Sequence, residues 1–396
     1  MSVRGPASLL DHFSCLSDPR QGWRVIYPLR EVLLLVLCAS LCGMDDFVEI
    51  RMWGDRRLDF LRRFYPFARG LPSHDTLNDI IDALDPHLFQ ACFTRWVKGL
   101  RDDLPEVVAI DGKTSRRTHD RGQGRAPLHM VSAWAARQRL VLGQEAVDVK
   151  SNEIVAIPLL LERLELTGAL VTIDAMGTQT DIADTIVRRG GDYLLSLKAN
   201  RPTLHRDVVD LFANPPPDMV SPVYETVDGD HGRIETRRHR VCHQVDWLFS
   251  DRRYAGEPRF PHLAMVGMIE SRVERNGALA TERRYSLSSA ALDAKTFAAA
   301  VRAHWGVENR LHWVLDVVFH DDLARLRTAN GPHNMAVQAH EYEPDPKPDR
   351  QAQPESSAKT RQPRPRLPRK PRPPGPVNLK RFPCCLYLRT NSSHSR

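Results

Sequence analysis

The chain has 396 residues, of which 42% are hydrophobic and 27% charged, and its formal net charge is +7. That length predicts two or three structural units and a sizeable core. The longest apolar stretch, Val32 to Met44, is shorter than the roughly 20 residues of a membrane span, so we expect a buried helix and no membrane partner. No apolar signal sequence opens the chain, and the seven cysteines are irregularly spaced. These features favour a cytoplasmic protein without a disulfide framework or zinc ribbon.

Residues 1–100 show helical periodicity. We expect one helix at Leu29 to Leu41, a second at Asp45 to Phe64 with arginines between its apolar residues, and a third capped by Ser73. The pattern predicts an all-helical N-terminal domain. Exposed arginines on such a domain fit contact with DNA, but ordinary helix packing explains the same residues equally well.

After Pro105 the pattern becomes that of a mixed α/β domain over residues 101–337. Short apolar runs at 106–110 and 169–173 predict buried strands, and a hairpin turns near residues 137–139. Helices are expected between the later strands. From about residue 221 to 290 the chain alternates between apolar and polar residues again, which predicts a β-rich insertion.

Two of the apolar strands are each followed by an aspartate and a turn of small residues. These are "VVAIDGKTSRR" with Asp111 and "LVTIDAMGTQ" with Asp174. A carboxylate at the end of a buried strand is rigidly aimed and partly desolvated, which suits a hard divalent cation. A strand-end aspartate also commonly caps the next turn, and that interpretation stays open for either one alone. The repetition favours a metal site.

A third carboxylate, Glu308, stands among apolar residues in "RAHWGVENRLHWVLDVVFHDD". If residues 296–319 form one helix, spacings of three and four place Glu308 on its apolar face. A buried carboxylate without a partner is costly. The partner is either a neighbouring arginine, of which Arg302 and Arg310 are nearest, or a metal ion shared with Asp111 and Asp174. Two divalent ions held by three carboxylates can activate a water or a 3′-hydroxyl and stabilise the leaving oxygen of a phosphodiester.

Six segments of the chain, with its N-terminal region, match the motifs of a known family in order over residues 8–337. They are "VVAIDGKTSRR", "KSNEI", "TIDAMGTQ", "GDYLLSLKAN", "HGRIETR" and "HWGVENRLHWVLDVVFHDD". Together they resemble the H-repeat-associated (ISAs-type) transposases of bacterial insertion sequences, a branch of the Asp-Asp-Glu transposases. The region containing "GWRVIYPLREVLLLVLCASLCG" resembles the helical domain associated with that family.

The resemblance implies an α/β, RNase H-like catalytic domain in which Asp111, Asp174 and Glu308 are the catalytic, metal-binding triad. It implies Mg²⁺ (or Mn²⁺) as the ion, with insertion-sequence ends and target DNA as partners. The implied reaction is hydrolysis at the element's ends and attack of the freed 3′-hydroxyl on target DNA, both phosphoryl transfers. Two alternatives stay open: a catalytically inactive DNA-binding remnant, and a metal-dependent nuclease without strand transfer. Whether the protein forms a homodimer is also open.

The chain departs from the wider group at the residues around the glutamate. Related transposases carry Tyr and Arg before it and Lys two turns after it, whereas Val301, His304 and Leu315 stand in those places here. The phosphate contacts are therefore expected from other polar side chains. The candidates for DNA binding are Lys113, Arg116, Arg117, Lys198, Asn200, Arg233, Arg237, Arg302, Asn309 and His312. The alternative is that these side chains are simply solvated.

The basic excess of the chain lies in its last part. Residues 339–396 hold 13 Lys or Arg against 5 Asp or Glu, together with 12 of the 29 prolines. Such a segment cannot bury enough apolar surface to offset its ordering entropy, so we expect residues 338–396 to be a disordered tail. Two interpretations stay open: a basic arm that binds phosphates, or the product of a reading frame shifted near Val337.

Overall fold

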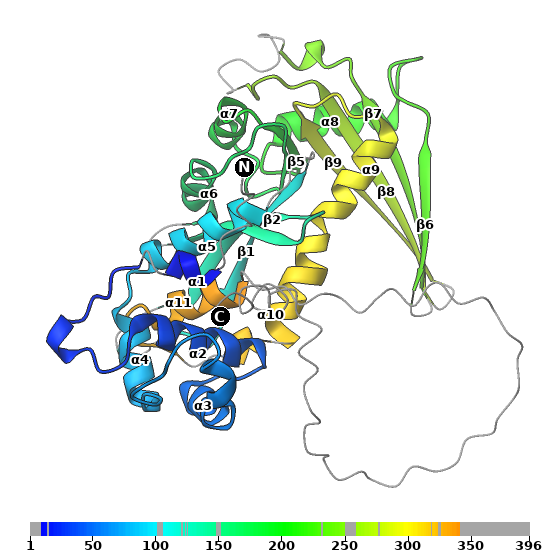
Figure 1. Cartoon of the computed structure of the whole chain (residues 1–396). Coiled ribbons are helices and arrows are strands. Elements are labelled where there is room, and N and C mark those ends of the chain that lie inside the picture. Colours follow the sequence, from blue (N-terminus) through cyan, green and yellow to red (C-terminus); the bar gives the residue numbers. More distant parts are fainter. Residues whose placement is uncertain are drawn as a thin grey trace, which may run out of the picture. The chain divides into compact units, whose positions relative to one another are not determined.

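The computed structural model describes most of the chain up to His340 (Figure 1). The described residues are 9–340 without 14–15, 101–105, 120–121, 123, 125, 148–151, 231–232, 250–258, 276–277, 318 and 324–325. The chain divides into a unit of residues 1–342 and a unit of residues 343–396. Residues 341–396, on which most of the predicted tail falls, lie outside the described residues. No helix in the described part is long and apolar enough to cross a membrane.

The N-terminal part is helical, as predicted. Its elements are α1 (Leu9–Phe13), η1 (Gly22–Arg24), α2 (Leu29–Leu41), α3 (Phe47–Leu61), α4 (His74–Ala83) and α5 (Pro86–Leu100). Helix α2 has the predicted bounds and is buried nearly all round, because its apolar residues leave no polar face. The predicted cap of α4 is confirmed, since Ser73 Oγ accepts the backbone N–H of Thr76 at 3.2 Å. Asp46 caps α3 in the same way.

One nine-stranded sheet runs through the rest of the unit, in the order β3-β2-β1-β4-β5-β9-β8-β7-β6. The strands are β1 (Val107–Ser115), β2 (Leu128–Ala135), β3 (Leu140–Ala146), β4 (Leu170–Ile173), β5 (Asp192–Leu197), β6 (Tyr224–Asp230), β7 (Arg233–Cys242), β8 (Met265–Arg275) and β9 (Ala278–Ser288). Strands β1, β4 and β5 are parallel to one another, and all other pairs are antiparallel. The predicted mixed α/β class and the β2–β3 hairpin are confirmed.

Helices cover both faces of the first five strands. The core on one face joins β1 and β4 to α6 (Glu153–Leu161) and α7 (Thr180–Arg188), and α8 (Pro202–Ala213) follows β5. The other face packs beneath α9 (Ala294–His304) and the helical segments after it, which cross the sheet in Figure 1. Because side chains alternate along a strand, successive residues of β1 enter different cores: Ile110 faces α6 and Ala109 faces the α9 side.

The predicted single helix over residues 296–319 is wrong in one respect. Helix α9 ends at His304, a π-helical turn, η3, spans Val307–His312, and α10 spans Trp313–Val317. A π-helical turn contains more residues than an α-helical turn. A helix face predicted at 3.6 residues per turn therefore no longer points in the same direction after such a turn. Two further segments, η4 (Asp321–Leu323) and α11 (Gly331–His340), follow, and a short turn η2 (Asp246–Phe249) lies between β7 and β8.

Helix α11 packs against the N-terminal helices α4 and α5. Asn334 of α11 is fully buried there, and its Nδ2 donates to the backbone oxygens of Ile81 at 2.8 Å and Leu84 at 3.2 Å. A buried amide held by two carbonyls fixes the register between the segments. The N-terminal helices are thus completed by residues close to the end of the described chain.

The junction between α9 and η3 is tightly packed against the sheet. A methyl group on Gly306 would lie 2.9 Å from Cζ3 of Trp134, whose ring is buried. We therefore expect Gly306→Ala to lower the free energy of unfolding by about 1–3 kcal/mol, as overpacking does. Urea unfolding followed by circular dichroism measures this change.

Gly99→Ala is the matched control for that measurement, because Gly99 is also helical and has nothing within 4 Å of an added methyl. It should be neutral or stabilising, since alanine is the better helix former. Equal stability of the Gly306→Ala protein and the unsubstituted protein would mean that the Trp134 ring moves aside at no cost.

Candidate active site

Asp111 and Asp174 occupy matching positions on neighbouring parallel strands. The parallel pairing of β1 with β4 ends at Ile110 opposite Ile173, and each aspartate is the next residue. Asp174 follows the end of β4, as predicted. Asp111 does not end its strand: β1 continues to Ser115 because the antiparallel partner β2 pairs with it that far. It stands where the parallel pairing stops, so both carboxylates lie at one edge of the parallel strands.

Backbone N–H groups orient both aspartates. Asp111 Oδ1 accepts the N–H of Gly112 at 2.9 Å. Asp174 Oδ1 accepts the N–H groups of Met176 at 3.0 Å and Gly177 at 3.3 Å. Asp174 therefore caps the turn after β4, which was the alternative interpretation of its position. Oδ1 accepts the hydrogen bonds of the turn, and Oδ2 is left to bind a ligand.

Glu308 lies on the helical segment that crosses the two strands, but not on its buried face. Val307, Leu311 and Leu315 pack against the sheet, whereas Glu308 is exposed. The prediction of a carboxylate within the apolar stripe is wrong, because the stripe passes through Val307 and the π turn of η3 sets Glu308 beside it. Arg302, one of the two arginines considered as its partner, instead pairs with Asp228 at 3.4 Å.

The site has a surplus of negative charge around Asp111. Burial raises the pKa of Asp111 to about 7, although the Gly112 N–H stabilises its charged form. The charges of Glu308, Glu153 and Asp174, in this order of size, contribute to the same rise in pKa. The three predicted triad residues therefore influence one another electrostatically. Their carboxylate oxygens are not all within 4.8 Å of one another.

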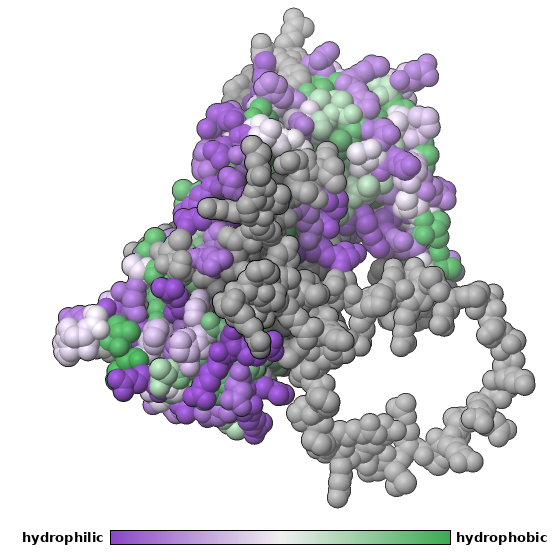
Figure 2. Space-filling model, in the orientation of Figure 1, coloured by the Kyte–Doolittle hydropathy of each residue, from purple (hydrophilic) through white to green (hydrophobic). Residues whose placement is uncertain are grey.

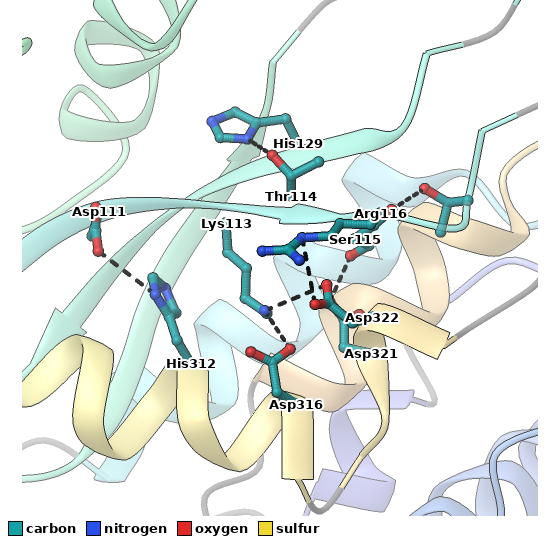
Figure 3. Close-up of polar contacts among 11 residues, drawn as sticks. Asp111, Lys113, Thr114, Ser115, Arg116, His129, His312, Asp316, Asp321 and Asp322 are labelled. Carbon is teal, nitrogen blue, oxygen red and sulfur yellow. Dashed lines mark hydrogen bonds and ion pairs between the residues drawn. The ribbon is translucent and has the colours of Figure 1, made fainter.

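Two histidines of the crossing helices face the two strands. His304 Nδ1 lies 2.9 Å from Oγ1 of Thr172 on β4, and burial lowers the pKa of His304. His312 Nδ1 lies 3.6 Å from Oδ2 of Asp111 (Figure 3), and burial, with the nearby Lys113 ammonium, lowers its pKa to about 4. Both rings are therefore neutral at pH 7. His312, which was predicted to bind DNA, instead packs 14% exposed beside Asp111.

Lys113 also departs from its predicted role at the DNA. Its side chain is 8% exposed and its Nζ lies 2.6 Å from Asp316 Oδ1 and 4.0 Å from Asp322 Oδ1 (Figure 3). Ser115 donates to Asp321 Oδ2 at 2.7 Å beside it. These three aspartates are the one group within the described residues whose acidic atoms lie close enough for a metal. Lys113 offsets part of the negative charge of that group and ties β1 to the segment after Glu308.

A groove adjoins Glu308. It encloses about 670 Å³ between the β6–β9 strands and α9, and Glu308 lines it together with Arg237, Arg302 and Asn309, three of the predicted DNA-binding residues. Arg237 and Arg302 both pair with Asp228 on its wall. The structure thus brings part of the predicted set to one place beside the third carboxylate.

The remaining predicted residues lie elsewhere around the strands. Lys198 is exposed just after β5. Asn200 Nδ2 donates to the backbone oxygen of Ala175 at 2.6 Å, so it supports the turn after Asp174. Arg116 is 80% exposed, 3.6 Å from Asp322. Two others complete the set: Arg117 is exposed after β1, and Arg233 begins β7.

Sequence comparison identifies this arrangement. The family model described as "Transposase DDE domain" matches residues 83–339, and the model "DDE_Tnp_1-associated" matches residues 10–97. The chain belongs to the DDE transposase family. The family recognised from the motifs is confirmed, and so is the RNase H-like character of the domain that carries β1, β4 and α9.

Relatives of this transposase cover most of its length. The "H repeat-associated putative transposase YhhI" of Escherichia coli strain K12 is 37% identical over 326 residues, 81% of this chain and 85% of that protein. The "Putative transposase YncI" of Escherichia coli O157:H7 is 39% identical over 329 residues, 82% of this chain and 83% of that protein. The "Uncharacterized protein in dhlA 3'region" of Xanthobacter autotrophicus is 41% identical over 302 residues, 74% of this chain and all of that protein.

Proposed function

We propose that the protein cleaves DNA at the ends of its insertion sequence and transfers the freed 3′-hydroxyl to target DNA. The observation that carries the proposal is the matching position of Asp111 and Asp174 on adjacent parallel strands, with Glu308 on the helix that crosses them. In phosphoryl transfer, catalysis is mostly positioning and charge neutralisation. The rigid strands and the helix packed on them supply the positioning, and cations held by the three carboxylates would supply the charge neutralisation.

The donor set suits Mg²⁺ or Mn²⁺. Asp111, Asp174 and Glu308 offer only hard carboxylate oxygens, and a divalent cation would offset both the burial of the Asp111 charge and the nearby charges of Glu308 and Asp174. Three carboxylates of this kind would hold one or two such ions. When bound, such ions activate the attacking oxygen and stabilise the leaving oxygen.

The chain's own residues hold the parts of this site in place. Gly112 and the turn at Met176 and Gly177 fix the carboxylates of the two strands through backbone hydrogen bonds. Val307 and Leu311 anchor the crossing helix, so the exposed carboxylate beside them faces the groove. We assign a DNA strand to that groove. Arg302 is 60% exposed, so its guanidinium can exchange Asp228 for a phosphate.

One experiment tests this function against its alternatives. The purified full-length protein is incubated with Mg²⁺ and a labelled duplex carrying the DNA that flanks the gene. Strand-transfer products are the expected result. Binding without cleavage would identify a catalytically inactive remnant, and cutting that ignores the ends would identify a nuclease without strand transfer.

We also assign a DNA contact to the N-terminal helices, proposed as a domain over residues 1–100. Arg56, Arg57 and Arg63 are exposed on and just after α3, and Figure 2 shows mostly hydrophilic side chains over the area of α2 and α3. Replacing all three by alanine should reduce the slope of log K against log salt concentration by about 3, because each arginine would then no longer neutralise one phosphate. Fluorescence anisotropy at several salt concentrations measures the slope.

The matched control replaces Arg163, Arg188 and Arg189, which are partly exposed around α6 and α7. It removes the same charge and should leave the slope nearly unchanged. An equal decrease of the slope in both triple variants would point to general electrostatic attraction in place of a contact at α3.

A further inference from the structure

A chain of hydrogen-bonded side chains lies on the face of β1 opposite Asp111. Oγ1 of Thr114 is 2.6 Å from Nδ1 of His129, and Nε2 of His129 is 2.7 Å from Oε1 of Glu153. His129 belongs to β2 and Glu153 begins α6, so the chain joins three elements. In Figure 3, Thr114 and His129 lie on one side of β1 and Asp111 lies on the other.

Glu153 lies directly against the backbone beside Asp111. A methyl group on Gly112 would overlap Glu153 Oε1 and lie 2.7 Å from His129 Nε2, so only glycine leaves room for both. The N–H of the same Gly112 donates to Asp111 Oδ1. A displacement of Glu153 can therefore shift the Asp111 carboxylate through Gly112 alone.

Glu153 is the glutamate of the segment "KSNEI", to which the site described so far gives no role. Its side chain is 15% exposed and bound through one oxygen to His129. Because it lies across the strand from Asp111, it is placed to support a ligand without being one. Such outer partners of ligands typically change metal affinity by about 10–100-fold.

We propose that Glu153 is a positioning residue of the metal site: His129 holds it, and it fixes the Gly112 backbone and thereby the Asp111 carboxylate. The inference rests on the proposed function, in which Asp111 binds the cation. The negative charge of Glu153 also raises the pKa of Asp111, by more than that of Asp174 does, which agrees with its closeness.

Titration of the full-length protein with Mn²⁺, followed by the electron paramagnetic resonance signal of free Mn²⁺, tests the proposal without any assay of activity. Glu153→Ala and His129→Ala should each weaken Mn²⁺ binding by about 10–100-fold. The double variant should be little weaker than either single one, because both substitutions break the same chain. Glu153→Gln keeps an oxygen acceptor for His129 and should bind nearly as the unsubstituted protein does.

Two further variants separate the outcomes. Glu162→Ala, at the other end of α6, should leave the affinity unchanged. Asp111→Asn should weaken it, and if it does not, the proposed function fails and the positioning role with it. If Asp111→Asn weakens binding and Glu153→Ala does not, only the positioning role fails. If Glu153→Gln binds Mn²⁺ as weakly as Glu153→Ala does, the positioning role is also overturned. The negative charge of Glu153 would then be the reason for the loss of affinity. Thermal unfolding without Mn²⁺ identifies any variant that is misfolded.

Discussion

Asp111→Asn and Glu308→Gln are each expected to slow cleavage of end-containing DNA in Mg²⁺ by at least about 100-fold, the lower range for losing one group that stabilises a transition state. Each substitution keeps the shape of the side chain and removes the charge that a divalent cation requires. Binding of the same DNA should change little, because neither carboxylate contacts phosphate without a cation. Single-turnover cleavage and a mobility-shift titration measure the two effects.

Asp184→Asn and Glu162→Gln are the matched controls for cleavage. Both residues are exposed around α6 and α7 and pair with Arg188, so they remove the same charges away from the carboxylates. They should retain full cleavage. Near-normal cleavage by either active-site variant would show that the triad assigned to Asp111, Asp174 and Glu308 is wrong.

Asp111→Asn is also expected to stabilise the metal-free protein at pH 8, by as much as about 4 kcal/mol. The pKa of Asp111 is about 7 in the folded protein, against an ordinary value of 3.8, so folding favours the protonated form. Its contribution to stability is therefore greatest below pH 4 and is lost as the pH rises through 7. A rise from 3.8 to about 7 corresponds to about 4 kcal/mol, and asparagine avoids this cost. Urea unfolding in EDTA at pH 5 and pH 8 measures it.

The comparison must be made between variants, because buried histidines act in the opposite direction. Burial lowers the pKa of His312 and of His333 to about 4, so their contribution to stability is lost as the pH falls. At pH 5 and above both rings stay largely neutral in the folded protein, with or without the Asp111 charge beside His312, so their contribution is common to both proteins and cancels in the difference. The gain from Asp111→Asn should therefore be larger at pH 8 than at pH 5. A gain of equal size at both values would contradict the raised pKa.

Local pattern was sufficient for much of the fold. The bounds of α2 could be predicted because an apolar run is closed by Pro28 before it and by Cys42 and Gly43 after it. The hairpin of β2 and β3 could be predicted from its polar turn. The end of β1 could not be predicted, because the length of this strand is set by its pairing with β2 and not by its own sequence.

The site was predictable to the same degree. Asp111 and Asp174 could be paired from two similar strand ends, since parallel neighbours bring such ends together. The exposure of Glu308 could not be predicted, because the periodicity argument assumes one number of residues per turn and the π-helical turn η3 has another. The burial of Lys113 was equally hidden, since its partner Asp316 is 203 residues away. A weak signal did exist: the acidic residues of "DVVFHDD" follow a helix and need a cation.

The contact of α11 with α4 and α5 also has a consequence for how the protein forms during synthesis. The N-terminal helices leave the ribosome first, yet the amide that holds Ile81 and Leu84 belongs to Asn334, some 250 residues later. At about 5–20 residues per second, that delay is on the order of ten seconds or more. A chain released early would lack this closing helix and expose the apolar faces of α4 and α5. The packing of the N-terminal helices can therefore be completed only after the strands and helices up to α11 have been translated.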